Sequence, residues 1–361
     1  MIFETKPAQQ NNPPAENRMI RVLIVDDAAF MRKAISSMIE DDPQIVVVGT
    51  ASNGQEGLEQ IEKLQPDVVT LDIDMPIMDG ITSIRHIMIK SPVPVVVLSS
   101  LFSDGAITFD AMRLGVVDFI PKPSGAVSTD IDRSRKHLVD RIKLASEVNL
   151  GNIRRVRLPR IENGNNLERH TYLPLDYILA LGTTLSGPNT IIRLLANLPT
   201  TLPTAVVVSL EMSPKVLSAF IERFDTLVNW EICEAKDGIP LKQGCCYISS
   251  SQNNVRVQTD PDGTISLRKT ENNKEPLNQL FTSAANVFQE NTIGILLTGT
   301  GTDGADGCTH IQKLSGVTMA QNTQTCVYPN LTDNAIKQGC VNTVLDETAL
   351  PQAIISVMTS K

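Results

Sequence analysis

Five polar residues in the first third of the chain each follow a run of apolar residues. They are Asp26, Asp27, Asp72, Ser99 and Lys122, and the preceding runs are Val22–Val25, Val68–Leu71, Val95–Leu98 and Val116–Ile120. If these runs are strands of one open parallel sheet, their carboxyl ends meet where such sheets bind ligands. Carboxylates bind hard cations such as Mg²⁺, and a hydroxyl and an ammonium group suit phosphoryl oxygens. The spacing therefore predicts a site for a divalent cation and a phosphoryl group.

The pattern between these runs indicates the helices that would hold the strands in one sheet. Short apolar runs alternate with segments of helical periodicity, which is typical of βαβ units. After Asp27, apolar residues recur with the helical period of about 3.6 residues. These residues are Phe30, Ala34, Ile35, Met38 and Ile39. The first half of the chain is therefore expected to be an α/β domain with a parallel sheet.

Four short motifs in this half resemble the receiver domain of two-component response regulators. They are VDD at Val25–Asp27, LDIDMPIMDG at Leu71–Gly80, LSS at Leu98–Ser100 and PKP at Pro121–Pro123. The resemblance covers residues 20–124 and implies a doubly wound, five-stranded parallel, flavodoxin-like fold. It implies that Asp72 is the phosphoacceptor and holds Mg²⁺ together with Asp26 and Asp27. The implied switch residues are Ser99, Phe119 and Lys122.

Composition bounds the classes of protein that the chain can belong to. Its 361 residues are enough for two domains. The net charge of −8 disfavours non-specific nucleic-acid binding. No run approaches the ~20 apolar residues that a membrane-spanning helix needs, so we expect no membrane insertion. The polar segment Met1–Met19 lacks a signal-peptide core and is expected to be a disordered tail. Six cysteines, all after residue 230, are predicted to be free thiols in a cytoplasmic protein.

A basic stretch follows the receiver-like segment and is predicted to lie in a linker over residues 125–171. From Arg133 to Arg160 there are nine Lys or Arg against two Asp or Glu, a local charge of +7. Helical periodicity continues to about Val148. Two interpretations remain open. The stretch is either a solvated basic connector, or its charge docks an acidic face of the receiver or of a partner.

A second α/β pattern occupies residues 172–361. The predicted strands are Tyr177–Leu181, Ala205–Val208, Glu231–Ala235, Cys245–Ser249, Val255–Gln258, Ile265–Arg268 and Gly294–Leu297, and the predicted helices are Ser213–Phe224 and Leu277–Gln289. Asp260–Gly263 has the composition of a hairpin turn.

This half resembles the catalytic domain of chemotaxis protein-glutamate methylesterases, the CheB family. The strongest motif is LTGTGTDGADG at Leu297–Gly307, and weaker matches are at Gly182–Pro188, Met212, Ala235–Gly238 and Ala320–Gln321. The resemblance implies a Rossmann-like α/β domain joined to a receiver that covers its cleft until phosphorylated. It also implies a chemotaxis-type histidine kinase and methyl-accepting chemoreceptors as partners, in flagellar or pilus chemosensory systems.

The positions of the catalytic triad depart from the family's pattern. The family uses Ser, His and Asp to hydrolyse a γ-glutamyl methyl ester or a glutamine amide. Thr184 stands at the serine position, Glu211 at the histidine position, and Asp303 keeps the aspartate. A further family histidine falls at Asn254, and the chain's own histidines, His86, His137, His170 and His310, match no motif position.

Two hypotheses follow from these replacements. Carboxylates ordinarily have pKa values of about 4, so they accept a proton from an alcohol poorly, and loss of one triad member costs on the order of 10⁴-fold. The first hypothesis is a signalling protein whose effector domain has lost ester hydrolysis and acts by binding. The second is an active esterase or amidase with a Thr/Glu/Asp site, in which adjacent like charges at Glu211 and Asp303 make one a better base.

Overall fold

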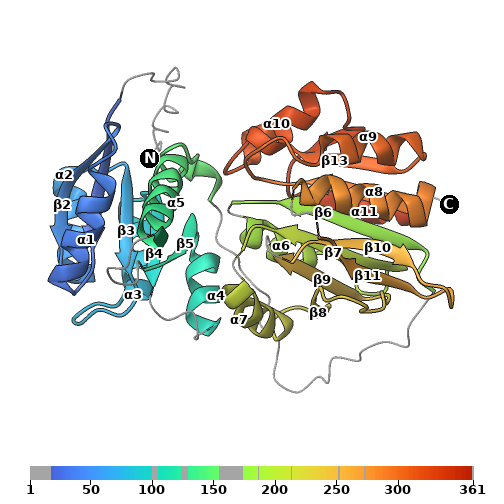
Figure 1. The fold of residues 1–361 in the computed structure, drawn as a ribbon, viewed down its shortest axis with the longest axis horizontal. Helices are drawn as coiled ribbons and strands as arrows, with labels where there is room; N and C mark the ends of the chain where they lie inside the picture. The colour runs from blue at the N-terminus through green and yellow to red at the C-terminus, as the bar shows by residue number, and fades with distance from the viewer. Residues whose placement is uncertain are drawn as a thin grey trace, which may run out of the picture.

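The computed structural model describes residues 18–99, 105–122, 129–153, 174–185, 187–212, 214–250, 253–271 and 274–359. They form two α/β units, which lie on the left and right of Figure 1. Most of the tail predicted over residues 1–19, and the predicted linker from residue 154 to residue 171, lie outside these ranges.

The first unit is built on a five-stranded parallel sheet in the order β2-β1-β3-β4-β5. Its strands are β1 (Ile20–Val25), β2 (Ile45–Ala51), β3 (Val68–Asp72), β4 (Val95–Ser99) and β5 (Asp118–Pro121). Valine, leucine and isoleucine fill the strands because both faces of the sheet are covered by helices. The strand order is the flavodoxin-like one, so the predicted receiver fold is confirmed.

Helices cover both faces of this sheet. The helices are α1 (Ala29–Ile39), α2 (Gly54–Leu64), α3 (Gly80–Lys90), α4 (Gly105–Leu114) and α5 (Thr129–Ser146). α1 and α5 pack on one face, and α2, α3 and α4 pack on the other. α5 lies within the predicted linker, but its Leu138 and Ile142 are buried in the core of the first unit. The expectation that Phe30 joins the apolar face of α1 is wrong, because Phe30 lies in the first turn of α1 and is exposed.

The second unit is built on a seven-stranded parallel sheet in the order β14-β13-β12-β6-β7-β9-β8. Its strands are β6 (Tyr177–Thr183), β7 (Thr204–Leu210), β8 (Glu231–Glu234), β9 (Cys245–Ser250), β12 (Thr292–Leu296), β13 (Val317–Gln321) and β14 (Thr343–Leu345). The hairpin of β10 (Val255–Thr259) and β11 (Ile265–Lys269) pairs separately, and Gly263 takes the positive φ that its turn requires. All predicted strands of this half are present.

The helices of the second unit also divide between two faces. They are α6 (Gly187–Ala196), α7 (Pro214–Asp225), α8 (Pro276–Phe288), α9 (Ala305–Lys313), α10 (Asn330–Lys337) and α11 (Leu350–Thr359). In the described ranges, short 3₁₀ helices lie at Gln289–Asn291 and Thr323–Thr325 of this unit, and at Leu150–Asn152 after α5. α6, α7 and α11 bury one face of the sheet, while α8, α9, α10 and the hairpin bury the other.

The two units pack against each other through helices α4 and α7, which lie side by side in Figure 1. Phe109 of α4 is fully buried, and its ring centroid lies 5.6 Å from that of Phe220 and 6.3 Å from that of Phe224. Away from this aromatic cluster, the Asn152 side chain donates to the carbonyl oxygens of Gln324 and Cys326, both at 2.7 Å. Because Phe109 and Met112 of α4 belong to the same apolar cluster as the buried residues of α7, the core is continuous from one unit to the other.

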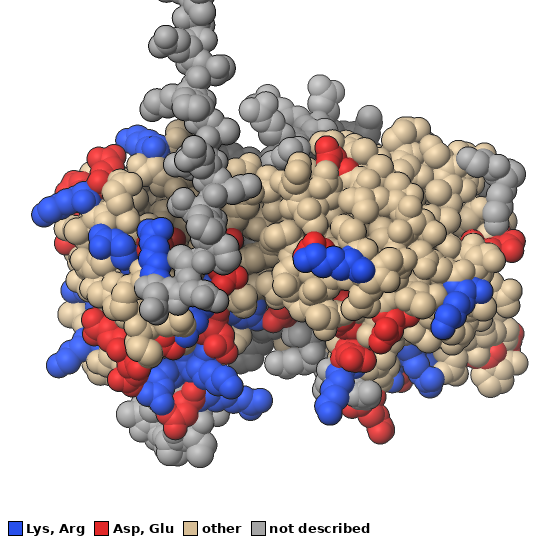
Figure 2. All heavy atoms as spheres, turned by 90° about the horizontal axis from the view of Figure 1, so that it is seen from above, with Lys and Arg blue, Asp and Glu red and all other residues tan. Residues whose placement is uncertain are grey.

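The distribution of charged residues on the surface, the state of the cysteines and the character of the helices can each be compared with what the composition predicts. Positive and negative side chains are intermixed on the face in Figure 2, with broad uncharged areas between them. All six cysteines are free thiols, as predicted. Within the described part of the chain, no helix has the length and apolar character needed to cross a membrane.

Candidate functional site

The first polar cluster lies at the carboxyl ends of β1, β3 and β5. Carboxylate oxygens of Asp26, Asp27 and Asp72 lie within 4.8 Å of one another. The Lys122 ammonium lies 2.7 Å from Asp26 Oδ2 and 2.8 Å from Asp72 Oδ2. The sheet thus brings together the four charged residues that the sequence singles out.

Local backbone bonds orient these carboxylates. Asp26 Oδ1 accepts from the Ala28 N–H at 2.9 Å, and Asp72 Oδ1 accepts from the Ile73 N–H at 2.8 Å. The second oxygen of each carboxylate is left facing Lys122. Burial raises the pKa of Asp72 despite its bond to Lys122. Burial opposes the charged form of Lys122, but its bonds to Asp26 and Asp72 outweigh burial and raise its pKa.

The donor set fits a hard divalent cation. Mg²⁺ prefers oxygen ligands and keeps several waters, so a few carboxylates and an open side suffice. Asp26 and Asp72 are buried, whereas Asp27 is exposed at the rim. Asp26, Asp27 and Asp72 would hold Mg²⁺, which would neutralise charge on a phosphoryl group beside Lys122.

The switch residues predicted from the sequence lie next to this cluster. Ser99 is buried at the end of β4, and its carbonyl accepts from the Lys122 N–H at 3.0 Å. Phe119 is partly buried in β5 and packs both against the first unit's core and against the core that contains α7. A change of the Phe119 rotamer would therefore alter packing contacts in both units.

The second polar cluster lies at the carboxyl edge of the seven-stranded sheet. Thr184 follows β6, Glu211 follows β7, and Asp303 lies in the loop after β12. These three strands are neighbours, with β6 between the other two. The structure therefore brings the three predicted positions to one edge of the sheet, at the point where ligands of open α/β sheets bind.

Thr184 uses its hydroxyl in a backbone bond. Its Oγ1 accepts from the Thr300 N–H at 2.7 Å. A Cβ at Gly299 would stand only 2.6 Å from this oxygen, so the absence of a side chain there permits the close approach. Among the described residues, neither a carboxylate nor an imidazole is hydrogen-bonded to this hydroxyl.

Asp303 joins two helices at their amino ends. Its carboxylate accepts from the backbone N–H groups of Leu277 at 2.7 Å and Asn278 at 2.9 Å, at the start of α8. In return, Asn278 Oδ1 accepts from the N–H groups of Gly304 at 3.0 Å and Gly307 at 2.8 Å, at the start of α9. Burial raises the pKa of Asp303, and these N–H bonds oppose the rise. Asp303 therefore has a structural role that does not depend on catalysis.

Removal of this cap should destabilise the second unit. Asp303→Ala is expected to lower its free energy of unfolding by about 1–2 kcal/mol, because two helix N–H groups lose their acceptor. Urea denaturation followed by fluorescence of Trp230 measures this, since the chain's one tryptophan is buried in that unit. Asp333→Ala, which removes an exposed carboxylate paired with Lys337, serves as control and should shift stability by less than about 0.5 kcal/mol. An unchanged midpoint for Asp303→Ala would contradict the capping role.

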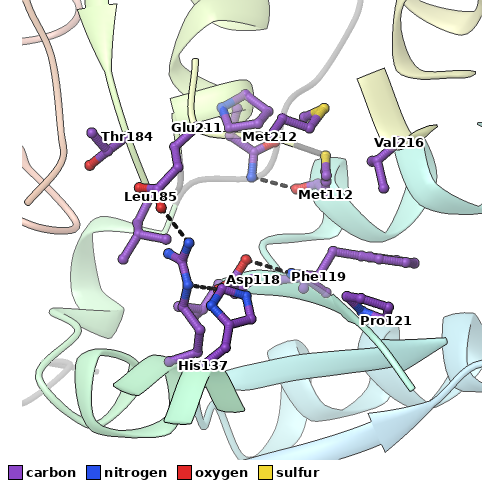
Figure 3. Close-up of a pocket in the computed structure, with 15 residues that line it drawn as sticks. Met112, Asp118, Phe119, Pro121, His137, Thr184, Leu185, Glu211, Met212 and Val216 are labelled. Carbon is purple, nitrogen blue, oxygen red and sulfur yellow. Dashed lines mark hydrogen bonds and ion pairs between the residues drawn. The ribbon is translucent and has the colours of Figure 1, made fainter. Parts of the chain in front are cut away.

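Glu211 points toward the first unit rather than toward Thr184 (Figure 3). Its carboxylate pairs with the guanidinium of Arg141 on α5, whose Nε lies 3.3 Å from Asp118 Oδ2 of β5. In the described structure the like charge that acts on Asp303 is that of Glu275, and the carboxylate of Glu211 is paired with Arg141 instead. The pairing of like charges considered for the second hypothesis is therefore absent.

A cavity of about 240 Å³ lies between the units at this point. Thr184 and Glu211 line it from the second unit, and Asp118, His137 and Arg141 line it from the first. His137, which matches no motif position, reaches the interface because α5 carries it there. Burial, followed by the charge of Arg141, lowers the pKa of His137. His137 makes no hydrogen bond to Thr184 in the described structure.

The sequence interpretation missed Arg141 and Asp118. The signal that could have found Arg141 is the basic stretch, for which docking to an acidic face was one of the two alternatives. Arg135 pairs with Asp41 and Lys143 with Asp42, so the described part of the stretch docks on acidic residues of the receiver, while residues 154–160 lie outside the described ranges. Asn254, at the position of a further family histidine, is buried, and His310 on α9 contacts Asn286.

Family models match both units. A CheB methylesterase model matches residues 179–354, and a response regulator receiver domain model matches residues 22–129. The chain is 36% identical to protein-glutamate methylesterase/protein-glutamine glutaminase 1 of Oleidesulfovibrio alaskensis, over 94% of this chain and 100% of that protein. It is 32% identical to the protein of the same name from Pyrococcus abyssi, over 95% of this chain and 94% of that protein.

Two solved structures resemble the separate units. The CheB methylesterase catalytic domain of Thermotoga maritima is 26% identical, with a TM-score of 0.47, over 50% of this chain and 98% of that chain. The response regulator domain of Thermotoga maritima CheB is 44% identical, with a TM-score of 0.34, over 37% of this chain and 99% of that chain. Because relatives above 30% identity are matched over nearly their whole length, the chain belongs to the CheB family of chemotaxis response regulators, the protein-glutamate methylesterases/protein-glutamine glutaminases.

Proposed function

We propose that this protein is a phosphorylation-controlled chemosensory response regulator whose effector domain no longer hydrolyses esters and acts by binding. The observation that carries the proposal is the ion pair between Glu211 and Arg141. The group at the acid–base position is held by a cation of the receiver, and the Thr184 hydroxyl is held by the backbone of Thr300. General base catalysis requires the base to lie within hydrogen-bond reach of the proton it removes.

The receiver supplies the input of this proposed function. Asp72 accepts a phosphoryl group from a chemotaxis-type histidine kinase, with Mg²⁺ held by Asp26, Asp27 and Asp72. Lys122, now paired with Asp26 and Asp72, is positioned to bind the incoming phosphoryl oxygens. Methyl-accepting chemoreceptors are the proposed binding partners of the effector domain.

The alternative is an active methylesterase or deamidase that uses Thr184, Glu211 and Asp303. The relatives favour it, because they are named for an enzyme activity. The structure sets out what this alternative needs. Glu211 must leave Arg141 and reach Thr184, and the Thr184 hydroxyl must leave the Thr300 N–H.

Methanol release from a methylated chemoreceptor fragment tests the proposed function. Wild type is expected to give no release above the no-enzyme rate, with or without acetyl phosphate and Mg²⁺, because no base contacts the Thr184 hydroxyl. A methylesterase with an intact Ser–His–Asp triad is the positive control. Phosphodonor-dependent release by wild type that disappears in Thr184→Ala would establish the alternative instead.

A further inference from the structure

We propose that Glu211 is the effector-domain half of an ion-pair latch, formed by Asp118, Arg141 and Glu211, that holds the two domains closed. The inference deepens the proposed function, on which it rests for the role of phosphorylation. Glu211 stands where the family has its catalytic histidine, and in this latch it holds the two domains together. The three residues come from β5, α5 and the end of β7, so the latch bridges receiver and effector.

The geometry suits a bridge rather than an incidental surface pair. Arg141 uses two different nitrogens, Nε toward Asp118 and a terminal nitrogen toward Glu211. A planar guanidinium presents separate N–H groups in fixed directions, so it can bind two carboxylates in a defined geometry. Only 13% of the Arg141 side chain is exposed, compared with 19% for Asp118 and 33% for Glu211.

Burial makes Arg141 and Asp118 dependent on their partners. Burial opposes the charge of Arg141, but Asp118 and Glu211 outweigh it and raise the pKa of its guanidinium. Removing one partner of a buried pair is costly because it leaves an unpaired charge. Asp118 Oδ2 is itself buried without a hydrogen bond, so its charge depends on Arg141.

The remaining cross-domain contacts near the latch are mainly apolar or neutral. Phe109 packs on Phe220 and Phe224, and the Asn189 side chain donates to the Met112 carbonyl. These contacts bury surface between the domains, but they carry no charge that could respond to phosphorylation. Beside them, the described residues place the charged pair of Arg141 and Glu211.

The latch is connected to the phosphorylation site through one short strand. Asp118 begins β5, Phe119 follows it, and Lys122 lies directly after the strand. Lys122 now pairs with Asp26 and Asp72. A phosphoryl group on Asp72 would draw Lys122 into new bonds and displace β5, which carries Asp118. β5 is therefore the element that would couple the two sites, because Lys122 follows one end of it and Asp118 begins the other.

Hydrogen–deuterium exchange of the full-length protein tests the latch without a hydrolysis readout. Glu211→Gln is expected to speed exchange of the α4 and α7 amides about tenfold, because Arg141 loses its effector partner while keeping Asp118. Arg141→Met should speed it at least as much, because it removes the pairs with both Asp118 and Glu211. The double variant should exchange no faster than Arg141→Met alone, because the pair that Glu211→Gln removes is already lost. Arg141→Lys should open the domains partly.

Two matched variants control for loss of charge alone. Lys143→Met removes a neighbouring cation of α5 that pairs with Asp42 inside the receiver, and Glu222→Gln removes an exposed carboxylate of α7. Both should exchange like wild type in α4 and α7. Exchange in Glu211→Gln that equals wild type and Glu222→Gln would overturn the latch.

A second arm links the latch to phosphorylation. Acetyl phosphate with Mg²⁺ should speed exchange at the same amides in wild type, and should add little in Glu211→Gln, where the latch is already released. Equal fold increases in both proteins would show that phosphorylation acts elsewhere and would overturn the coupling. Ester hydrolysis by wild type would refute the proposed function. The exchange results would still decide whether the latch exists, because they do not depend on hydrolysis.

Discussion

Hydrolysis of a methylated receptor fragment by the phosphorylated protein should exceed the no-enzyme rate by on the order of 10²-fold when Thr184→Ser and Glu211→His are combined. An imidazole accepts and returns a proton near neutral pH, which the carboxylate of Glu211 does poorly. The new imidazole also cannot pair with Arg141, so the receiver should hold the cleft less tightly. Asp303 already stands at the same edge of the sheet. Methanol release under saturating phosphodonor measures the gain.

The single changes serve as the controls for this experiment. Because triad residues act as a unit, Thr184→Ser and Glu211→His alone should each stay within a fewfold of wild type. If Thr184→Ser alone recovered the full gain, Glu211 would be a working base, and the ion pair with Arg141 would not prevent catalysis.

Phosphorylation should be lost completely in Asp72→Asn. The carboxylate of Asp72 is buried beside Lys122, and an amide at this position has neither the charge to hold Mg²⁺ nor an oxygen nucleophilic enough to accept the phosphoryl group. Incubation with acetyl phosphate and Mg²⁺, followed by intact mass measurement, gives the extent of phosphorylation.

Asp74→Asn is the matched control, because Asp74 lies two residues away and is exposed. It should be phosphorylated as wild type is. Undiminished phosphorylation of Asp72→Asn would place the phosphoacceptor at another aspartate, with Asp26 and Asp27 as the first candidates.

The sequence predicted the position of the receiver cluster because the polar residues follow apolar runs that are recognisable as strands. Asp26, Asp72 and Lys122 each end or directly follow a buried strand, and parallel pairing of those strands brings their ends together. Once the strands are identified, the site follows from topology alone. Phe30 was misplaced because periodicity gives the face of a helix, but not which residues of that face are covered by the rest of the fold.

The sequence predicted where the effector residues lie, but not which residues they would contact. The motifs place Thr184, Glu211 and Asp303 at neighbouring strand ends, and the strand order confirms this. Their partners depend on contacts that no local pattern encodes. The Arg141–Glu211 pair joins residues 70 positions apart in different domains, and the bonds from Leu277 and Asn278 to Asp303 depend on how α8 meets the loop before α9.

Covalent labelling of the threonine hydroxyl tests the central claim, that Thr184 is not an activated nucleophile. Phosphorylated wild type is incubated with a fluorophosphonate, which reacts with hydroxyls that a neighbouring base activates, and intact mass is then measured. The account predicts no adduct on wild type, and an adduct on the Thr184→Ser, Glu211→His double variant under the same conditions. A stoichiometric adduct on wild type that maps to Thr184 would contradict the account and would make this chain an esterase with a threonine nucleophile.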